Sequence, residues 1–174
     1  MNCDKKTMSR LERLVVIDFE ASSLSEGSWP VEVGISWIER GELRSWASLI
    51  RPDAGWSMDH WSIASAAVHR IPLETLSSAS PAKEVADTLI TLVAGKRLVS
   101  DAPTFERMWL SKLLAAAGHS RKSGIAEYNE ITFSIFDGYA LDMVYETLER
   151  TFVPHRAGPD SARLVKGWLK GAET

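Results

Sequence analysis

Two carboxylates at the end of an apolar run are the first residues of this chain whose types and spacing suggest chemistry. Asp18 and Glu20 follow the run Leu14–Ile17, and residues i and i+2 of a β-strand share one face. Like charges held this close raise each other's pKa unless a cation lies between them. Mg²⁺ and Mn²⁺ are hard cations that prefer oxygen ligands. The pair therefore indicates a divalent-metal site at a strand end, and the alternative is a pair of solvated acids.

A histidine and a third acid stand close together near the other end of the chain. His155 and Asp160 flank the start of a predicted helix. Histidine titrates near neutrality and can take a proton from water, and an aspartate can add an oxygen ligand to a metal site. The alternatives are a surface histidine and an acid favoured at a helix N-terminus by the helix dipole.

Two more acids lie between these pairs. Asp101 follows a short apolar segment, and Glu106 falls in the first turn of the helix predicted after it. Either could supply a further carboxylate to the same site. The alternatives are a turn residue and an ordinary acid in a first helical turn.

The apolar pattern predicts the elements that must position these residues. Strands are expected at 13–19, 31–38, 43–50, 97–100 and 131–136. Helices are expected at 81–94, 105–117, 139–150 and 160–169, with helical pieces in 57–76 and a polar, frayed segment at 1–11. A hairpin-rich start followed by alternating strands and helices predicts an α/β domain with a mixed sheet, antiparallel first and parallel later, flanked by helices.

Length and composition set limits on the function. The 174 residues suit a single domain at 13–174, preceded by a polar extension at 1–12. The only cysteine is Cys3, which excludes an intrachain disulfide and fits a reducing compartment. The absence of a secretory or membrane-spanning segment predicts a cytoplasmic protein without a membrane partner. The net charge of −3 favours a short or single-stranded ligand over long duplex nucleic acid, which usually requires a basic field.

Taken together in order and spacing, the three acidic segments resemble the 3′→5′ exonucleases of the ribonuclease-H-like superfamily. The resemblance is to the DEDD enzymes with a catalytic histidine (DEDDh), the family of the proofreading subunit of DNA polymerase III and of ribonuclease T. Asp18 and Glu20 match its D-x-E motif, and His155 with Asp160 matches its third motif. Residues 30–34 and 67–71 resemble its I-E-I-G and H-G-I segments.

The second motif departs from the family pattern. It normally ends in Phe-Asp, and here it reads Phe105-Glu106. By register Glu106 takes the metal position, and its side chain is one methylene longer than aspartate. Asp101 is the alternative ligand. The departure leaves open a second interpretation, a catalytically weakened module of the same fold that binds nucleic acid or protein.

The resemblance implies a two-ion mechanism with Mg²⁺ or Mn²⁺. Asp18 would bridge both ions, Glu20 and Asp160 would complete the first ion's ligands, and Glu106 would support the second. His155 would take the proton from the attacking water. The implied activity is hydrolysis at the 3′ end of single-stranded or short DNA or RNA, releasing nucleoside 5′-monophosphates. Relatives of ribonuclease T often pair, so a homodimer is compatible with the resemblance.

The resemblance also implies a seat for the 3′-terminal nucleotide after the first strand. The backbone of Ala21 and Ser22 would approach the 3′-hydroxyl, and Phe19 or Leu24 would lie near the terminal base. Other residues have two interpretations from the sequence. Glu32 either supports the site or is an ordinary strand acid. On the last predicted helix, the basic residues either touch the substrate backbone or lie on a solvated helix face: Arg163, Lys166 and Lys170. Loop tryptophans are candidates for stacking on bases or for core packing: Trp29, Trp56 and Trp61.

Overall fold

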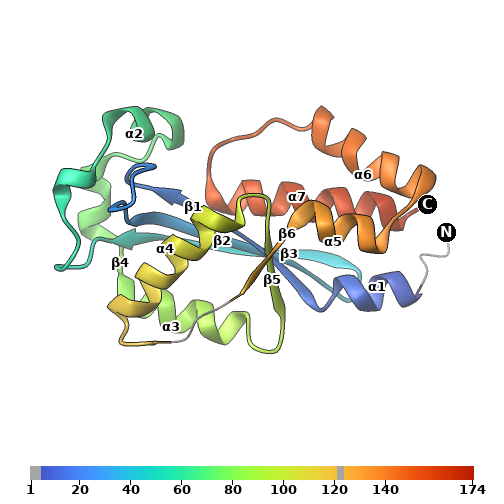
Figure 1. Cartoon of the computed structure of the whole chain (residues 1–174), viewed down its shortest axis with the longest axis horizontal. Helices are drawn as coiled ribbons and strands as arrows, with labels where there is room; N and C mark the ends of the chain where they lie inside the picture. The colour runs from blue at the N-terminus through green and yellow to red at the C-terminus, as the bar shows by residue number, and fades with distance from the viewer. Residues whose placement is uncertain (1–4, 121–123) are drawn as a thin grey trace.

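The computed structural model describes residues 5–120 and 124–174 (Figure 1). Cys3, on which the expectation of a reducing compartment depends, lies outside these residues. A mixed sheet of six strands in the order β4-β3-β2-β1-β5-β6 crosses the molecule. The strands are β1 (Leu14–Ala21), β2 (Pro30–Glu39), β3 (Glu42–Arg51), β4 (Ser80–Pro81), β5 (Arg97–Ser100) and β6 (Ile125–Glu127). The sheet is antiparallel across β1, β2 and β3, and β5 and β6 continue it parallel to β1, which confirms the predicted mixed α/β architecture.

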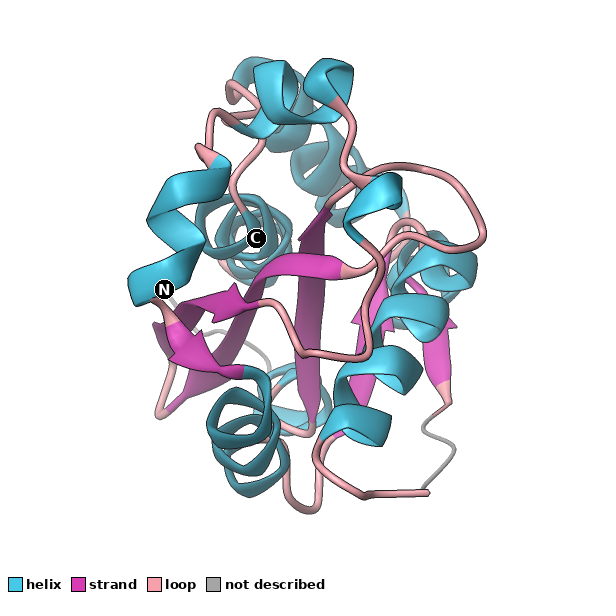
Figure 2. Cartoon of the chain, turned by 90° about the vertical axis from the view of Figure 1, so that its left-hand side faces the viewer, coloured by secondary structure: helices cyan, strands magenta, loops and turns pink. Residues whose placement is uncertain are grey.

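Helices cover both faces of this sheet, as Figure 2 shows. They are α1 (Lys5–Leu11), α2 (Ile63–His69), α3 (Ala82–Leu92), α4 (Pro103–Ala116), α5 (Tyr128–Ile135), α6 (Gly138–Arg150) and α7 (Ala157–Ala172), with 3₁₀ turns at Met58–His60 and Leu73–Ser78. None of the helices in the described ranges is long and apolar enough to cross a membrane.

Side chains of β1 alternate between two hydrophobic cores. Val15 and Ile17 join the core under α3 and α4, whereas Leu14 and Val16 join the core under α5, α6 and α7. This alternation follows from the period of two in a strand. It places the next even-numbered residue, Asp18, on the face that α7 covers, where α7 can bring a partner to it.

The predicted strand at 131–136 is wrong, because residues 131–135 belong to helix α5 and Phe136 caps it. Its buried residues Tyr128, Ile131 and Thr132 recur at helical spacing, while Phe133, which follows them, is 60% exposed. The β-branched run imitates a strand locally. Burial of one helical face against Trp168 and its neighbours in the core overrides that local preference.

The expectation of a frayed N-terminal segment is also wrong for residues 5–11. They form α1, and its last residue Leu11 is only 1% exposed within the core under α7. Arg10 ties the helix to α5 by donating a hydrogen bond from Nη2 to the Ser134 carbonyl at 2.9 Å. A short amphipathic helix is therefore stabilised here by tertiary contacts rather than by its own propensity.

A small third core explains the loop tryptophans. Trp29 is fully buried and stacks against Trp56 and Trp61, with ring centroids 5.9 and 5.8 Å away. Trp29 therefore packs in the core and is excluded as a base-stacking residue. Trp56 and Trp61 are partly buried in the same cluster. Trp109 and Trp168, which lie on helices, are also buried.

Candidate active site

The end of β1 supplies the first two acids of the site. Asp18 and Glu20 continue the even-numbered face of β1 beyond the core residue Val16, so both side chains point toward α7. Beyond Glu20 the strand pairing with β2 becomes irregular, and β1 ends at Ala21. The sequence prediction of adjacent carboxylates on one strand face is therefore matched by the geometry.

Helix α7 brings the third acid to β1 because β2 lets its first turn approach closely. A Cβ at Gly34 would lie 2.1 Å from the Ala157 carbonyl carbon and 2.3 Å from the Gly158 nitrogen. Only a glycine fits at this contact. The helix begins at Ala157, three residues earlier than expected, and Asp160 lies in its first turn.

An ion pair holds the same turn of α7 against the sheet. Glu32 on β2 is 4% exposed and accepts hydrogen bonds from Arg156 Nη2 at 2.6 Å and Nε at 2.9 Å. It also accepts from the backbone N–H of Ala157 at 3.0 Å. Glu32 thus supports the site, the first of its two interpretations from the sequence, by anchoring the segment that carries His155 and Asp160.

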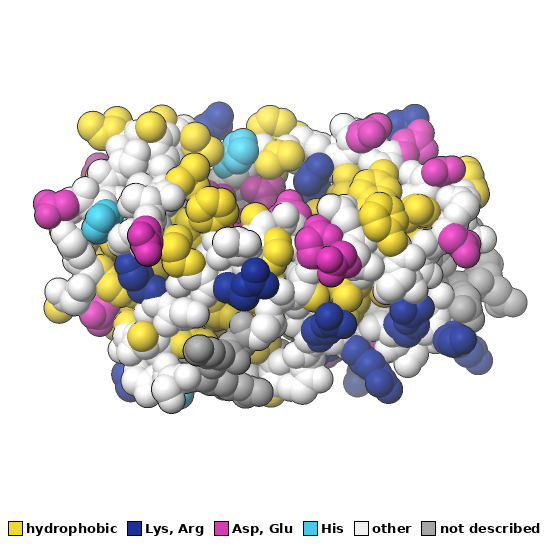
Figure 3. Space-filling model, in the orientation of Figure 1, with side chains coloured by type: hydrophobic (Ala, Val, Ile, Leu, Met, Phe, Trp, Pro, Cys, Tyr) yellow, Lys and Arg dark blue, Asp and Glu magenta, His cyan; other side chains and the backbone are white. Residues whose placement is uncertain are grey.

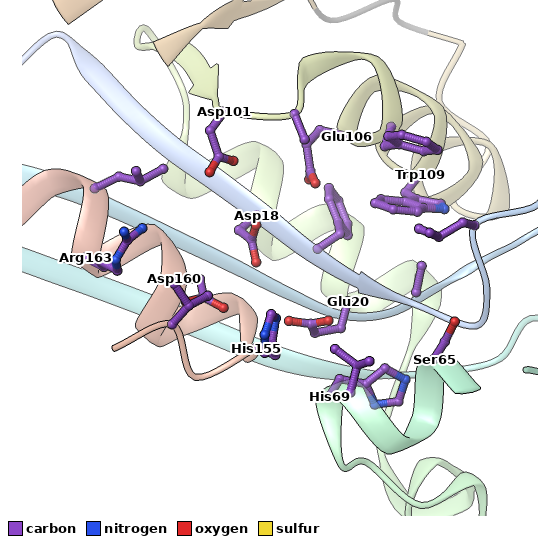
Figure 4. A pocket seen from close by; sticks show the side chains of 18 residues that line it. Asp18, Glu20, Ser65, His69, Asp101, Glu106, Trp109, His155, Asp160 and Arg163 are labelled. Carbon is purple, nitrogen blue, oxygen red and sulfur yellow. The ribbon is translucent and has the colours of Figure 1, made fainter. Parts of the chain in front are cut away.

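Asp18, Glu20 and Asp160 form a compact acidic cluster (Figure 4). One carboxylate oxygen from each of the three lies within 4.8 Å of the other two. Asp160 Oδ2 accepts a hydrogen bond from the Arg156 backbone N–H at 3.0 Å, whereas its buried Oδ1 has no partner among the described residues. Three converging carboxylates with an unpaired buried oxygen are a donor set that suits a hard divalent cation.

The second motif approaches the cluster from α4. Pro103 occupies the start of this helix, and Glu106 follows in its first turn. Glu106 is 2% exposed, and its Oε2 has no hydrogen-bond partner among the described residues. Figure 4 shows Glu106 and the more exposed Asp101 on the side of Asp18 away from Asp160. The fold thus brings both candidates for the second motif to the cluster.

Burial raises the pKa of every acid in this group, and for Asp18, Glu20 and Glu106 repulsion by neighbouring acids of the group adds to it. Burial, and after it the Glu20 charge, raises the pKa of Asp18 well above its usual value. Burial and the charges of Asp160 and Glu32 raise the pKa of Glu20 to about 7, against the opposing effect of Arg156. Burial, and after it the Asp18 charge, raises the pKa of Glu106 well above its usual value.

The remaining two acids follow the same trend. Burial of the carboxyl groups raises the pKa of Asp101 and Asp160, and the Arg163 charge opposes it in both. Carboxylates that repel one another in this way favour a cation between them. The residues present therefore fit one or two divalent ions.

His155 lies at the rim of the cluster. Its side chain is exposed and sits beside Glu20 and Asp160 in Figure 4. Its φ of 53° is left-handed, a conformation in which histidine is enriched relative to most residues. The charge of His155 lowers the pKa of Asp160. A histidine at this position can exchange a proton with a group bound at the acids.

A cavity of about 350 Å³ contains these residues, and part of its rim is apolar. Of the predicted substrate contacts, Phe19, Ala21 and Leu24 line it, and Leu24 is 71% exposed. Sequence reasoning did not find the other exposed apolar residues of the rim: Val68, Phe105 and Val153. Val68 and Phe105 lie within two of the motif-like segments, but only the exposure of all three in the fold identifies them as rim residues.

Ser22 does not line this cavity. Its hydroxyl accepts a hydrogen bond from the Trp29 N–H at 3.0 Å, and its own N–H donates to the Trp29 carbonyl at 2.9 Å. The Ser22 carbonyl accepts from the Ser62 N–H at 2.8 Å. Ser22 therefore joins the β1–β2 loop to the tryptophan core, and of the predicted pair only Ala21 remains beside the cavity.

Arg163 and His69 also line the cavity. Arg163, one turn after Asp160, donates to the Leu148 carbonyl at 2.8 Å and to Thr151 Oγ1 at 3.2 Å. It is half-buried, unlike the exposed Lys166 and Lys170 on the same helix. His69 is buried, as expected for a structural residue, and its Nδ1 accepts from the Ile71 N–H at 3.0 Å.

Comparison with solved structures identifies the architecture. A 3′-exonuclease in a structure of 3′-end recognition of the histone mRNA stem-loop matches with a TM-score of 0.67 and 13% identity, covering 94% of this chain and 82% of that one. The fold is that of the 3′-exonucleases.

Two more structures support this exonuclease fold. E. coli Exonuclease I in complex with a dA16 oligonucleotide matches with a TM-score of 0.64 and 9% identity, over 90% of this chain and 40% of that one. Exonuclease X in complex with 5′-overhanging duplex DNA matches with a TM-score of 0.54 and 20% identity, over 90% and 87%. No protein-family model and no curated protein sequence matches the chain. Similarity at this level of identity establishes a shared fold.

Proposed function

We propose that this protein is a metal-dependent 3′→5′ exonuclease of the DEDDh type, acting on single-stranded or short nucleic acid. The observation that carries the proposal is the meeting of Asp18, Asp160 and Glu106, from β1, α7 and α4, in one cavity beside a histidine. The exonucleases with the same fold were solved with an RNA stem-loop or with DNA, which supports a nucleic-acid substrate.

The acids would hold Mg²⁺ or Mn²⁺ in this cavity. Asp18, Glu20 and Asp160 form the set that already converges, and Glu106 supplies the carboxylate on the other side, with Asp101 as the alternative. When bound, two divalent ions stabilise the attacking and leaving oxygens of a phosphodiester in hydrolysis. The Glu106 side chain is one methylene longer than the aspartate of the family pattern.

The protein's own residues would position the strand and move the proton. The exposed apolar rim, including Leu24 and Phe105, would contact the terminal base. His155 would accept a proton from the attacking water. Water would add to phosphorus, and the 3′-oxygen of the preceding nucleotide would leave and take up a proton. The product is a nucleoside 5′-monophosphate. A cytoplasmic location and a homodimer stay predictions from the sequence.

A labelled single strand tests this proposal. With a 5′-fluorescent 20-nucleotide strand and Mg²⁺ or Mn²⁺, we expect stepwise shortening from the 3′ end that EDTA abolishes. Loss of a general base typically costs about 10²- to 10⁴-fold in rate, so His155→Ala should lose activity in that range. The control is His119→Ala, since His119 is exposed and pairs with Asp87 far from the cavity. Retention of the strand without shortening would support the weakened binding module instead.

A further inference from the structure

A second cavity lies at the opposite end of β1 and β5 from the acids. It measures about 400 Å³, and three arginines line it, Arg10, Arg13 and Arg97, together with apolar residues of α5. No Asp or Glu is among the described residues that line it. The chain as a whole carries a net charge of −3, so this basic cavity is a local reversal of sign. Its three guanidinium groups favour an anionic ligand over a neutral or cationic one.

Two of the three guanidinium groups are available for that ligand. Arg10 is held in place by the Ser134 carbonyl. The side chains of Arg13 and Arg97 are exposed and make no hydrogen bond or ion pair with the residues that the structure describes. Their backbones are joined, since the Arg97 N–H donates to the Arg13 carbonyl at 2.9 Å. Two neighbouring guanidinium groups are well suited to the charged oxygens of phosphate groups, with which they form charge-assisted hydrogen bonds.

The surrounding surface extends the positive charge. Lys96, next to Arg97, donates its ammonium group to the Glu12 carbonyl at 2.6 Å, which leaves its charge uncompensated by a carboxylate there. Figure 3 shows dark blue Lys and Arg side chains gathered at the lower right, over and beside α1 of Figure 1. A patch of this extent suits a polyanion with several phosphates.

The same two strands connect this cavity to the acids. Leu14 and Arg97, at the beginnings of β1 and β5, line the basic cavity, whereas Asp18 and Asp101, four residues further on, line the acidic one. Four residues of strand span about 13 Å. A stacked single strand advances roughly 3.4 Å per nucleotide, so about four nucleotides cover that separation, and more are needed to pass around α5.

We propose that the basic cavity binds phosphates of the nucleic-acid strand upstream of the 3′ end that lies at the acids. This inference rests on the proposed function and assigns its substrate class: strands longer than about five nucleotides, held at both ends of β1 and β5. Shorter strands reach only the acidic cavity. The basic cavity contributes affinity and no chemistry.

Binding measured without turnover tests the proposal. In EDTA, fluorescence anisotropy compares a 3-nucleotide with a 20-nucleotide single strand for the wild type and for Arg13→Gln/Arg97→Gln. Two lost phosphate contacts should weaken binding of the 20-mer about tenfold or more and reduce the slope of log K against log salt by about 1.4. Binding of the 3-mer should not change. The control Arg51→Gln/Lys166→Gln removes two exposed charges outside both cavities and should behave as the wild type.

Three results would overturn the inference. The double variant could bind the 20-mer as the wild type does, or it could lose affinity equally for both lengths. It could also lose only the binding of inorganic phosphate, which would assign the cavity to a free anion. Because these measurements involve no cleavage, a wild type that binds strands without shortening them would refute the proposed activity and leave this test valid. Matching thermal transitions of the variants show that folding is unaffected.

Discussion

Arg156 and Glu32 are 124 residues apart in the chain and form a bidentate ion pair, with Nη2 2.6 Å from Oε1 and Nε 2.9 Å from Oε2. The pair joins the residue before α7 to the middle strand β2. In the chain, Arg156 stands between His155 and Asp160. The geometry of the candidate site therefore depends on a contact outside the acidic cluster itself.

Removing the cation of this pair should destabilise the protein. Arg156→Met leaves the buried Glu32 carboxylate without its counter-ion, and because the Arg156 side chain is itself 42% exposed, the loss in the free energy of unfolding should be on the order of 1–3 kcal/mol. Urea denaturation measures the loss. Arg44→Met removes an exposed partner of Glu42 and should cost less than about 1 kcal/mol. Equal losses in the two variants would contradict the role given to Glu32.

Gly34→Ala should displace α7 and weaken metal binding. The added methyl group would meet the backbone of Ala157 at 2.1 Å, and no side-chain rotation can relieve a clash with backbone. Overpacking of this kind costs about 1–3 kcal/mol or more. Calorimetry should show Mn²⁺ affinity reduced at least about tenfold. Gly124→Ala, where nothing lies within 4 Å of the added Cβ, is the matched control, and unchanged Mn²⁺ affinity in Gly34→Ala would refute the prediction.

The stability of the metal-free protein should fall as the pH rises from 5 to 8. Burial raises the pKa of Glu20 from 4.5 to about 7, so the folded state binds this proton more tightly than the unfolded state does. That contribution is complete below about pH 4.5 and is lost as the pH rises through 7. The other four acids shift in the same direction. Allowing for partial exposure, Glu20 alone contributes on the order of 2 kcal/mol.

Thermal unfolding in EDTA and in Mn²⁺ measures this dependence. At pH 8, Mn²⁺ should raise the Tm by several degrees, and at pH 5 by much less, because protons then compete for the carboxylates. Asp18→Asn/Glu20→Gln should flatten the pH dependence and abolish the effect of Mn²⁺. A metal-free Tm that rises between pH 5 and 8 would show that the acids are not packed as described.

Substitution should decide between Glu106 and Asp101 as the acid of the second motif. Glu106 is buried and its pKa responds to the Asp18 charge, whereas Asp101 is more exposed. Glu106→Gln should reduce kcat about 100-fold, which corresponds to ~2.7 kcal/mol, and should stabilise the metal-free protein by removing a repelling charge. Asp101→Asn should have the smaller effect on kcat. The reverse order would assign the motif to Asp101.

Arg163 should hold the segment that carries His155. Its hydrogen bonds to Thr151 and the Leu148 carbonyl fix one end of residues 151–155, and Arg156 fixes the other. Arg163→Gln and Thr151→Val should both accelerate amide hydrogen exchange in this segment about tenfold and lower kcat without weakening Mn²⁺ binding. Lys166→Gln, on the exposed side of the same helix, is the control. Unchanged exchange in Arg163→Gln would show that the segment is held by other contacts.

The sequence by itself determined what depends on local pattern. An apolar strand ending in Asp18 and Glu20 predicts their shared face, and the order of hydrophobic runs predicts the mixed sheet. Even Glu106 and Asp160 could be placed in first helical turns, because a short motif carries its own helix signals. These predictions concern residues that are near one another in the chain.

Only the tertiary structure decided which distant segments touch. Trp29 looks like a loop residue in the sequence, yet two other tryptophans bury it. The β-branched run in α5 looks like a strand until its buried face is known. Gly34 and Glu32 acquire their roles from the backbone of α7 and the guanidinium of Arg156, more than a hundred residues away. Local sequence specifies secondary-structure preference, whereas steric fit and the pairing of buried charge are settled only when remote elements pack together.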